Sequence, residues 1–175
     1  MFMRELSRLS TQRPLTESEI SLAVSALRSE DEHEASTAGM ILVEQGKSVQ
    51  LSLLPLIHEL PLVIKKIITA YLMTATCAEV YIFFLDYLKE VDDAEYRQFL
   101  LASLSVTQYF ILPLIMVRLL YAEDEYLRSL GILLKEIGFD KLKLYLQAFP
   151  QYTLPKEDFF RQIFGDEAIT SLWKT

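Results

Sequence analysis

Glycine and proline are scarce in this chain, with only 5 and 6 of 175 residues. An all-β fold needs many turn residues, so this scarcity argues against sandwiches and barrels and favours helices. Hydrophobic residues make up 51% of the chain, which is ample for a packed core. We therefore expect an all-α fold in one domain, or a short array of helical repeats that behaves as one.

Side chains suited to metal or redox chemistry are also few. The single cysteine, Cys77, cannot form an internal disulfide, which fits a reducing compartment, and its apolar neighbours indicate a buried thiol. The two histidines, His33 and His58, lie 25 residues apart, whereas a metal site usually needs three or four closely spaced ligands. Neither a glycine-rich phosphate loop nor a Gly-x-Ser-x-Gly elbow is present. We expect no cofactor, no metal and no enzymatic activity.

Positive charge is in the minority, with a net charge of −7 and a pI of about 4.9. An acidic surface repels phosphate backbones, so nucleic acid is not an expected partner. The acidic residues gather at 30–34, 92–95 and 123–125. Because helix N-termini favour negative charge, we interpret these clusters as helix starts and not as acid–base sites.

Only one long run without a formal charge stands out, at residues 98–117. The N-terminus has no apolar run behind its charges, so a secretory signal is not expected and we predict a cytoplasmic protein. Residues 98–117 carry no formal charge, a length that could cross a bilayer, but polar side chains and Pro113 interrupt them. A small multi-span membrane protein with helices near 67–88 and 98–121 is therefore the alternative.

The tetrapeptide Leu-Pro-Leu-Ile occurs twice, at 54–57 and at 112–115, 58 residues apart. A near-copy, Leu-Pro-Leu-Val, occupies 60–63. A period of roughly 30 residues indicates stacked helical repeats, and the separation then equals two repeats.

Apolar periodicity predicts alternating first and second helices. The second helices carry one anchor leucine each, with spacings of 30, 32 and 30, at Leu42, Leu72, Leu104 and Leu134. The first helices are predicted at 17–28, 48–59, 77–90, 108–121 and 139–149, and a last helix at 156–173. Thr16 and Glu19 form a capping box, and Gly46 and Gly138 are natural helix stops. Prolines inside two first helices are expected to bend them.

These residues resemble HEAT repeats, the helical hairpins of α-solenoids. The best match is Asp93–Arg97 followed by Leu100 and Leu104, and Leu133–Gly138 is similar to the family's helix end. The resemblance implies a short right-handed α-α superhelix of about five hairpins over 16–150. Residues 1–15 would then be an N-terminal cap, and 151–175 a terminal cap or docking segment. Because the repeats are short and the turn arginine is present only at Arg97, a non-solenoid helical bundle stays open.

One polar row recurs with the repeat. The residues six positions before the anchors are Ser36, Lys66, Gln98 and Arg128, and Lys65 and Arg97 flank them. This row is either a solvated face or a mildly basic ridge that binds an acidic segment of a partner.

The C-terminal segment offers a second possible contact through Phe160, Phe164 and Trp173. It either closes the last repeat or docks into another protein as an amphipathic helix. We expect a non-enzymatic adaptor or scaffold subunit that binds another protein through an acidic or amphipathic helical segment.

Overall fold

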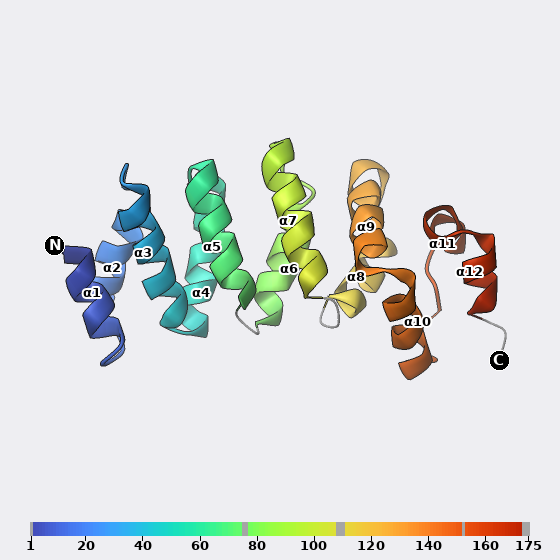
Figure 1. The fold of residues 1–175 in the computed structure, drawn as a ribbon, viewed down its shortest axis with the longest axis horizontal. Coiled ribbons are helices and arrows are strands. Elements are labelled where there is room, and N and C mark those ends of the chain that lie inside the picture. The colour runs from blue at the N-terminus through green and yellow to red at the C-terminus, as the bar shows by residue number, and fades with distance from the viewer. Residues whose placement is uncertain (1, 75–76, 108–110, 152, 173–175) are drawn as a thin grey trace. The chain divides into compact units, whose positions relative to one another are not determined.

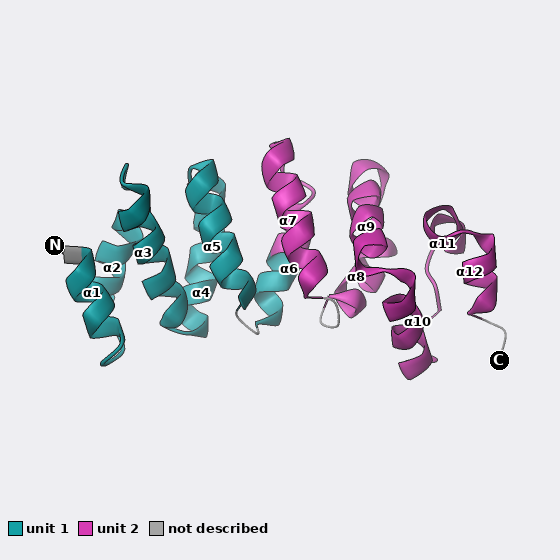
Figure 2. Ribbon diagram, in the orientation of Figure 1, with its two compact units in different colours: residues 1–83 teal, residues 84–175 magenta. Residues whose placement is uncertain are grey.

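The computed structural model describes residues 2–74, 77–107, 111–151 and 153–172. Every regular element in these ranges is a helix, which confirms the all-α prediction. The chain divides into two compact units, residues 1–83 and 84–175, and the boundary falls within α6 (Ala78–Tyr87) (Figure 2).

The first unit contains two alternating kinds of helix. In Figure 1, α3 and α5 lie side by side in one layer, and α2 and α4 lie behind them. The elements are α1 (Phe2–Ser10), α2 (Glu17–Ala26), α3 (Glu32–Glu44), α4 (Lys47–Leu53), the 3-10 helix η1 (Leu54–Glu59) and α5 (Leu62–Thr74).

The second unit repeats this alternation, with α7 packed against α9 and α9 against α11. Its elements after α6 are α7 (Ala94–Val106), α8 (Leu112–Leu119), α9 (Asp124–Ile137), α10 (Phe139–Ala148), α11 (Glu157–Phe164) and α12 (Asp166–Ser171). The single helix predicted at 156–173 is wrong, because Gly165, at φ +89°, ends α11 and starts α12. Gly46 and Gly138 lie between successive helices, as the predicted helix stops require, at φ +95° and +92°.

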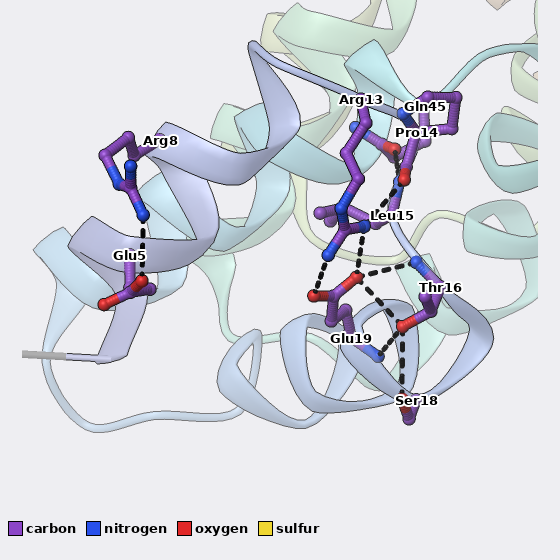
Figure 3. Close-up of polar contacts among 9 residues, drawn as sticks. All are labelled: Glu5, Arg8, Arg13, Pro14, Leu15, Thr16, Ser18, Glu19 and Gln45. Atoms are coloured by element: carbon purple, nitrogen blue, oxygen red, sulfur yellow. Dashed lines mark hydrogen bonds and ion pairs between the residues drawn. The ribbon is translucent and has the colours of Figure 1, made fainter.

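The start of α2 shows how the N-terminal segment is fixed (Figure 3). The Thr16 side chain accepts from the Glu19 amide, and the Glu19 carboxylate accepts from the Thr16 amide at 2.8 Å, so the predicted capping box is present. Both guanidinium nitrogens Nη1 and Nη2 of Arg13 donate to the same carboxylate, at 2.9 and 2.7 Å. The Arg13 contact, followed by the Thr16 bonds, lowers the pKa of Glu19 to about 2. The Leu15 amide donates to Gln45, which ties this segment to α3.

The anchor leucines occupy equivalent core positions. Leu42, Leu72, Leu104 and Leu134 lie on α3, α5, α7 and α9, and each is completely buried. Glycine stands three positions before two of them, where a neighbouring helix leaves little room for a side chain. A methyl group at Gly39 would lie 1.9 Å from Cδ1 of Ile68 on α5, and one at Gly131 would lie 3.0 Å from Cζ of Phe159 on α11.

Ion pairs within each unit also recur with the repeat. Arg28 pairs with Glu59 and Lys47 with Glu79 in the first unit, across sequence separations of 31 and 32 residues. Asp86 pairs with Arg118 in the second unit, across 32 residues. The period of roughly 30 residues read from the sequence is therefore also the sequence spacing of these three ion pairs.

The prolines do not bend their helices from the interior as predicted. Pro55 lies in the first turn of the 3-10 helix η1, and Pro113 lies in the first turn of α8. A helix tolerates proline in its first turn because the missing amide there has no helical partner. Proline therefore marks the start of a helical segment in both copies.

The stretches weighed as membrane spans are each divided between two helices, since α5 ends at Thr74 before α6 begins, and α7 ends at Val106 before α8 begins. Within the described ranges, none of the helices has the length and apolar character that crossing a bilayer requires.

Candidate interaction surface

The polar row predicted as a ridge lies at equivalent positions of second helices. Ser36 and Lys66 lie on α3 and α5, which pack together, and Gln98 and Arg128 lie on α7 and α9, which also pack together. Gln98 and Arg128 are exposed, whereas Ser36 and Lys66 are half-buried. Each unit therefore presents one pair of this row, and the ridge remains a prediction.

The arginine of the predicted turn motif has a structural role. Arg97 on α7 donates to the backbone carbonyl oxygen of Val91, through Nε at 3.1 Å and also through Nη2. Its Nη1 contacts the carboxylate of Glu125 at the start of α9. Arg97 therefore holds the α6–α7 connection to α7 and links α7 to α9. Lys65, the flanking residue in the first unit, is half-buried on α5.

The C-terminal segment turns its aromatic side chains inward. Phe160 is completely buried, and its ring lies 5.9 Å from that of Phe159 and 6.4 Å from that of Phe164. Phe164, half-buried, also lies 5.5 Å from the ring of Phe139 on α10. These four rings pack together at the end of the second unit, and Phe160 is not available on a surface. Trp173 lies outside the described residues.

The two copies of Leu-Pro-Leu-Ile lead into segments of different length. Eighteen residues separate Leu54 from the anchor Leu72, and twenty-two separate Leu112 from the anchor Leu134, so the second copy is four residues longer. In the first unit Pro61 directly precedes α5, and the connection is short. In the second unit α8 continues to Leu119, and 120–123 lead into α9.

This longer segment carries three exposed large apolar side chains. Val117 is 53% exposed, Leu120 56% and Tyr121 81%. Burying such side chains against a partner would be favourable by about 25 cal/mol per Å² of apolar surface removed from water. A cluster of them on one short segment is typical of a contact surface.

A pocket of about 220 Å³ opens beside them. Residues from the end of α8 form one wall, and the α10–α11 connection forms the other. Its lining residues are Met116, Val117, Leu120, Gln151, Thr153 and Pro155. We call this pocket together with Tyr121 the α8 patch.

The α10–α11 connection is held against the α8–α9 turn. The Lys156 ammonium donates to the carbonyl oxygen of Ala122 at 2.5 Å, and Leu154 is buried in the second unit. The Lys156 bond and the buried Leu154 therefore support this wall of the pocket.

A charged network links α8 to α6. Arg118 donates through Nε and Nη2 to the two oxygens of Asp86 on α6, at 3.0 and 2.8 Å. Burial acts to raise the pKa of Asp86, but Arg118 and then Lys89 outweigh it, so this pKa lies below its ordinary value. The Lys89 ammonium also lies 4.8 Å from the ring centre of Tyr126 on α9. Burial raises the pKa of the Tyr126 hydroxyl to about 12.

Acidic side chains surround the start of α9, immediately after the α8 patch. Glu123 and Asp124 are exposed, and Glu125 contacts Arg97. That contact brings the acidic start of α7, with the exposed Asp92 and Asp93, to the same end of the second unit. The α8 patch therefore combines an apolar pocket with an acidic border.

Three other features are weaker candidates for a functional site: a second pocket, the possible metal ligands and the cysteine. A wider pocket of about 490 Å³ between α1 and the start of α3 is lined by Arg4, Asp31, His33 and Glu34 among others, but Asp31 caps α3 and Glu34 accepts from Ser29. Among the described residues, His, Cys, Asp and Glu form no group of three that could hold a metal ion. Cys77 is buried, as predicted, and its thiol donates to Glu79 at 3.1 Å.

Comparison with protein-family models, curated proteins and solved structures finds no match to this chain. The likeness to HEAT repeats is therefore a resemblance carried by the motif residues and by the helical alternation. The α8 patch itself was not predicted from the sequence. The signal that could have found it is the four-residue excess in the second copy, together with apolar residues at 117, 120 and 121.

Proposed function

We propose that this chain is a non-enzymatic adaptor or scaffold, a short right-handed stack of HEAT-like hairpins that binds another protein through the α8 patch. The supporting observation is the contrast between the two tetrapeptide copies. The same core tetrapeptide precedes polar His58 and Glu59 in the first unit and exposed Val117, Leu120 and Tyr121 in the second.

The size of the pocket favours a protein partner. Sites for small molecules and cofactors usually enclose about 300–1,000 Å³ and bury most of the ligand. A pocket of about 220 Å³ is smaller and accommodates one or two side chains. Protein interfaces gain most of their affinity from a few such anchors set in preformed pockets, surrounded by contacts that exclude water.

The polar row is a second candidate surface for binding a protein partner. Lys66 and Arg128 lie at equivalent positions of α5 and α9 and would attract an acidic segment of a partner. Replacing both by Glu should weaken recovery of a partner that uses the ridge, and recovery equal to the wild type would dismiss the ridge.

The α8 patch is tested by affinity recovery of partners with the full chain and a paired variant, Val117→Ser with Leu120→Ser. Both side chains are more than half exposed, so the variant should keep its fold and melting temperature. The matched control is Leu144→Ser on α10, which is 55% exposed and does not line the pocket.

The proposal expects at least one partner that the wild type and the Leu144→Ser variant recover and the paired variant loses. The loss should exceed about 2 kcal/mol of binding free energy if the pocket holds an anchor residue. Identical recovery of every partner by the paired variant would refute the role of the α8 patch.

A further inference from the structure

We infer that the partner segment seated on the α8 patch is amphipathic and basic: a large apolar side chain enters the pocket, and a Lys or Arg beside it faces Glu123 and Asp124. This inference rests on the proposed function and adds the chemistry of the occupant. It differs from the ridge prediction, which requires an acidic partner.

The apolar half of the inference comes from the pocket walls. Met116, Val117, Leu120 and Pro155 are apolar, and Gln151 and Thr153 supply polar groups on one wall only. One apolar side chain fills such a space and removes Val117 and Leu120 from water. The amide of Gln151 and the hydroxyl of Thr153 can hydrogen-bond the backbone of the entering segment, which fixes its direction.

The basic half comes from the balance of charge at this end of the second unit. Several nearby cations already engage carboxylates: Arg118 with Asp86, Arg97 with Glu125, and Arg161 with Glu157. Lys156 lies closest to the turn, where its ammonium bonds the Ala122 carbonyl oxygen, and Arg128 is exposed one turn further along α9.

Against these two cations, and Lys89, which shares Asp86 with Arg118, stand four exposed carboxylates, Glu123 and Asp124 at the start of α9 and Asp92 and Asp93 before α7. The local field is therefore negative. A cation on the partner gains attraction and a carboxylate is repelled, which sets specificity and the rate of association.

The test is selection of short random peptides displayed on phage against the full chain, followed by affinity measurement on synthetic copies of the enriched peptides. We expect enriched sequences with one Leu, Phe, Trp or Met anchor and a Lys or Arg within four residues of it. Their affinity should fall by about thirtyfold for Val117→Ser with Leu120→Ser and stay unchanged for Leu144→Ser.

The charge component has its own matched pair. Glu123→Gln with Asp124→Asn should weaken these peptides several-fold at low salt and hardly at high salt. Glu136→Gln with Asp140→Asn removes the same charge at the far end of α9 and the start of α10. Since α9 has 14 residues and is about 21 Å long, this control lies beyond the Debye length of about 10 Å and should have no effect.

The outcomes separate the two proposals. Peptides that depend on Val117 and Leu120 but carry acidic or uncharged flanks would overturn the basic partner and leave the docking function standing. Enriched peptides that all bind the paired serine variant as well as the wild type would overturn the docking function itself.

Discussion

The same four residues start two different segments in the two units. Residues 54–57 open the 3-10 helix η1, and 112–115 open α8. In both copies the first leucine and the isoleucine are buried and the second leucine is half-buried. The tetrapeptide therefore specifies how a first helix enters the core, and it does not specify the helix type.

The difference comes from the residues after the tetrapeptide. In the first unit His58 packs edge-on against Phe83 at 5.9 Å, Glu59 pairs with Arg28, and Pro61 precedes α5. In the second unit no proline interrupts 116–123, so the helix continues and exposes Val117 and Leu120. The comparison teaches that two copies of one tetrapeptide can keep the same buried positions while the residues that follow them form different surfaces.

The largest expected effect tests whether the two copies are equivalent in the core. Ile57 and Ile115 are both completely buried. Replacing either with Ala should lower the free energy of unfolding by about 2–5 kcal/mol, through lost apolar transfer and a cavity. Denaturant titration of both variants checks this, and a negligible cost at one of the two sites would break the equivalence.

The next largest effect compares the stability cost of adding a methyl group at Gly39 and at Gly131. Gly39→Ala places a methyl group 1.9 Å from the fully buried Ile68, so we expect a loss of about 1–3 kcal/mol from overpacking. Gly131→Ala meets Phe159 at 3.0 Å, a milder contact that the higher helix propensity of Ala, worth about 1 kcal/mol, largely offsets. Thermal unfolding should rank Gly39→Ala well below Gly131→Ala, and the reverse order would contradict the packing described for α3 and α5.

A smaller effect distinguishes the ion pairs that connect neighbouring repeats. Arg28 and Glu59 are both more than half exposed, so Arg28→Ala should cost about 0–1 kcal/mol. Arg118 is only 14% exposed and makes two bonds to Asp86, so Asp86→Ala should cost about 1–2 kcal/mol by leaving a mostly buried guanidinium without these acceptors. Chemical unfolding of both variants measures these losses. Equal losses of unfolding free energy would contradict the difference between the exposed pair and the mostly buried pair.

The smallest effect concerns acid sensitivity in the first unit. The pKa of Glu19 is lowered to about 2 in the folded chain, against an ordinary value near 4.3, so its contribution to stability is complete above about pH 4.5 and is lost as the pH falls to 2. Arg13→Gln removes the main cause of this shift and should flatten that part of the profile. Melting temperatures of the two proteins between pH 7 and pH 2 provide the measurement, and parallel profiles would count against the Arg13 contact.

Much of the fold could be predicted because its signals are local. Thr16 with Glu19, the acidic helix starts, the stops at Gly46 and Gly138 and the apolar stripe of the second helices all act within one or two turns. The four anchor leucines were therefore correctly assigned to the core. The break at Gly165 is not predicted, although this glycine joins two helices with nearly the same backbone angles as Gly138.

The candidate surface could not be predicted in the same way because exposure depends on what packs opposite. Phe160 and Leu120 are both apolar residues on short segments, yet Phe160 is completely buried and Leu120 is 56% exposed. Arg97 was expected on a surface row, but the carbonyl oxygen of Val91 and the carboxylate of Glu125 engage its guanidinium. Only the three-dimensional neighbours distinguish these cases.

Hydrogen–deuterium exchange of the full chain, with and without a peptide selected on it, tests the central contrast most directly. The account predicts slower exchange in 112–123 and 149–156 when the peptide is bound, and no change in 54–63. Protection confined to 54–63, or spread equally over both copies of the tetrapeptide, would contradict it.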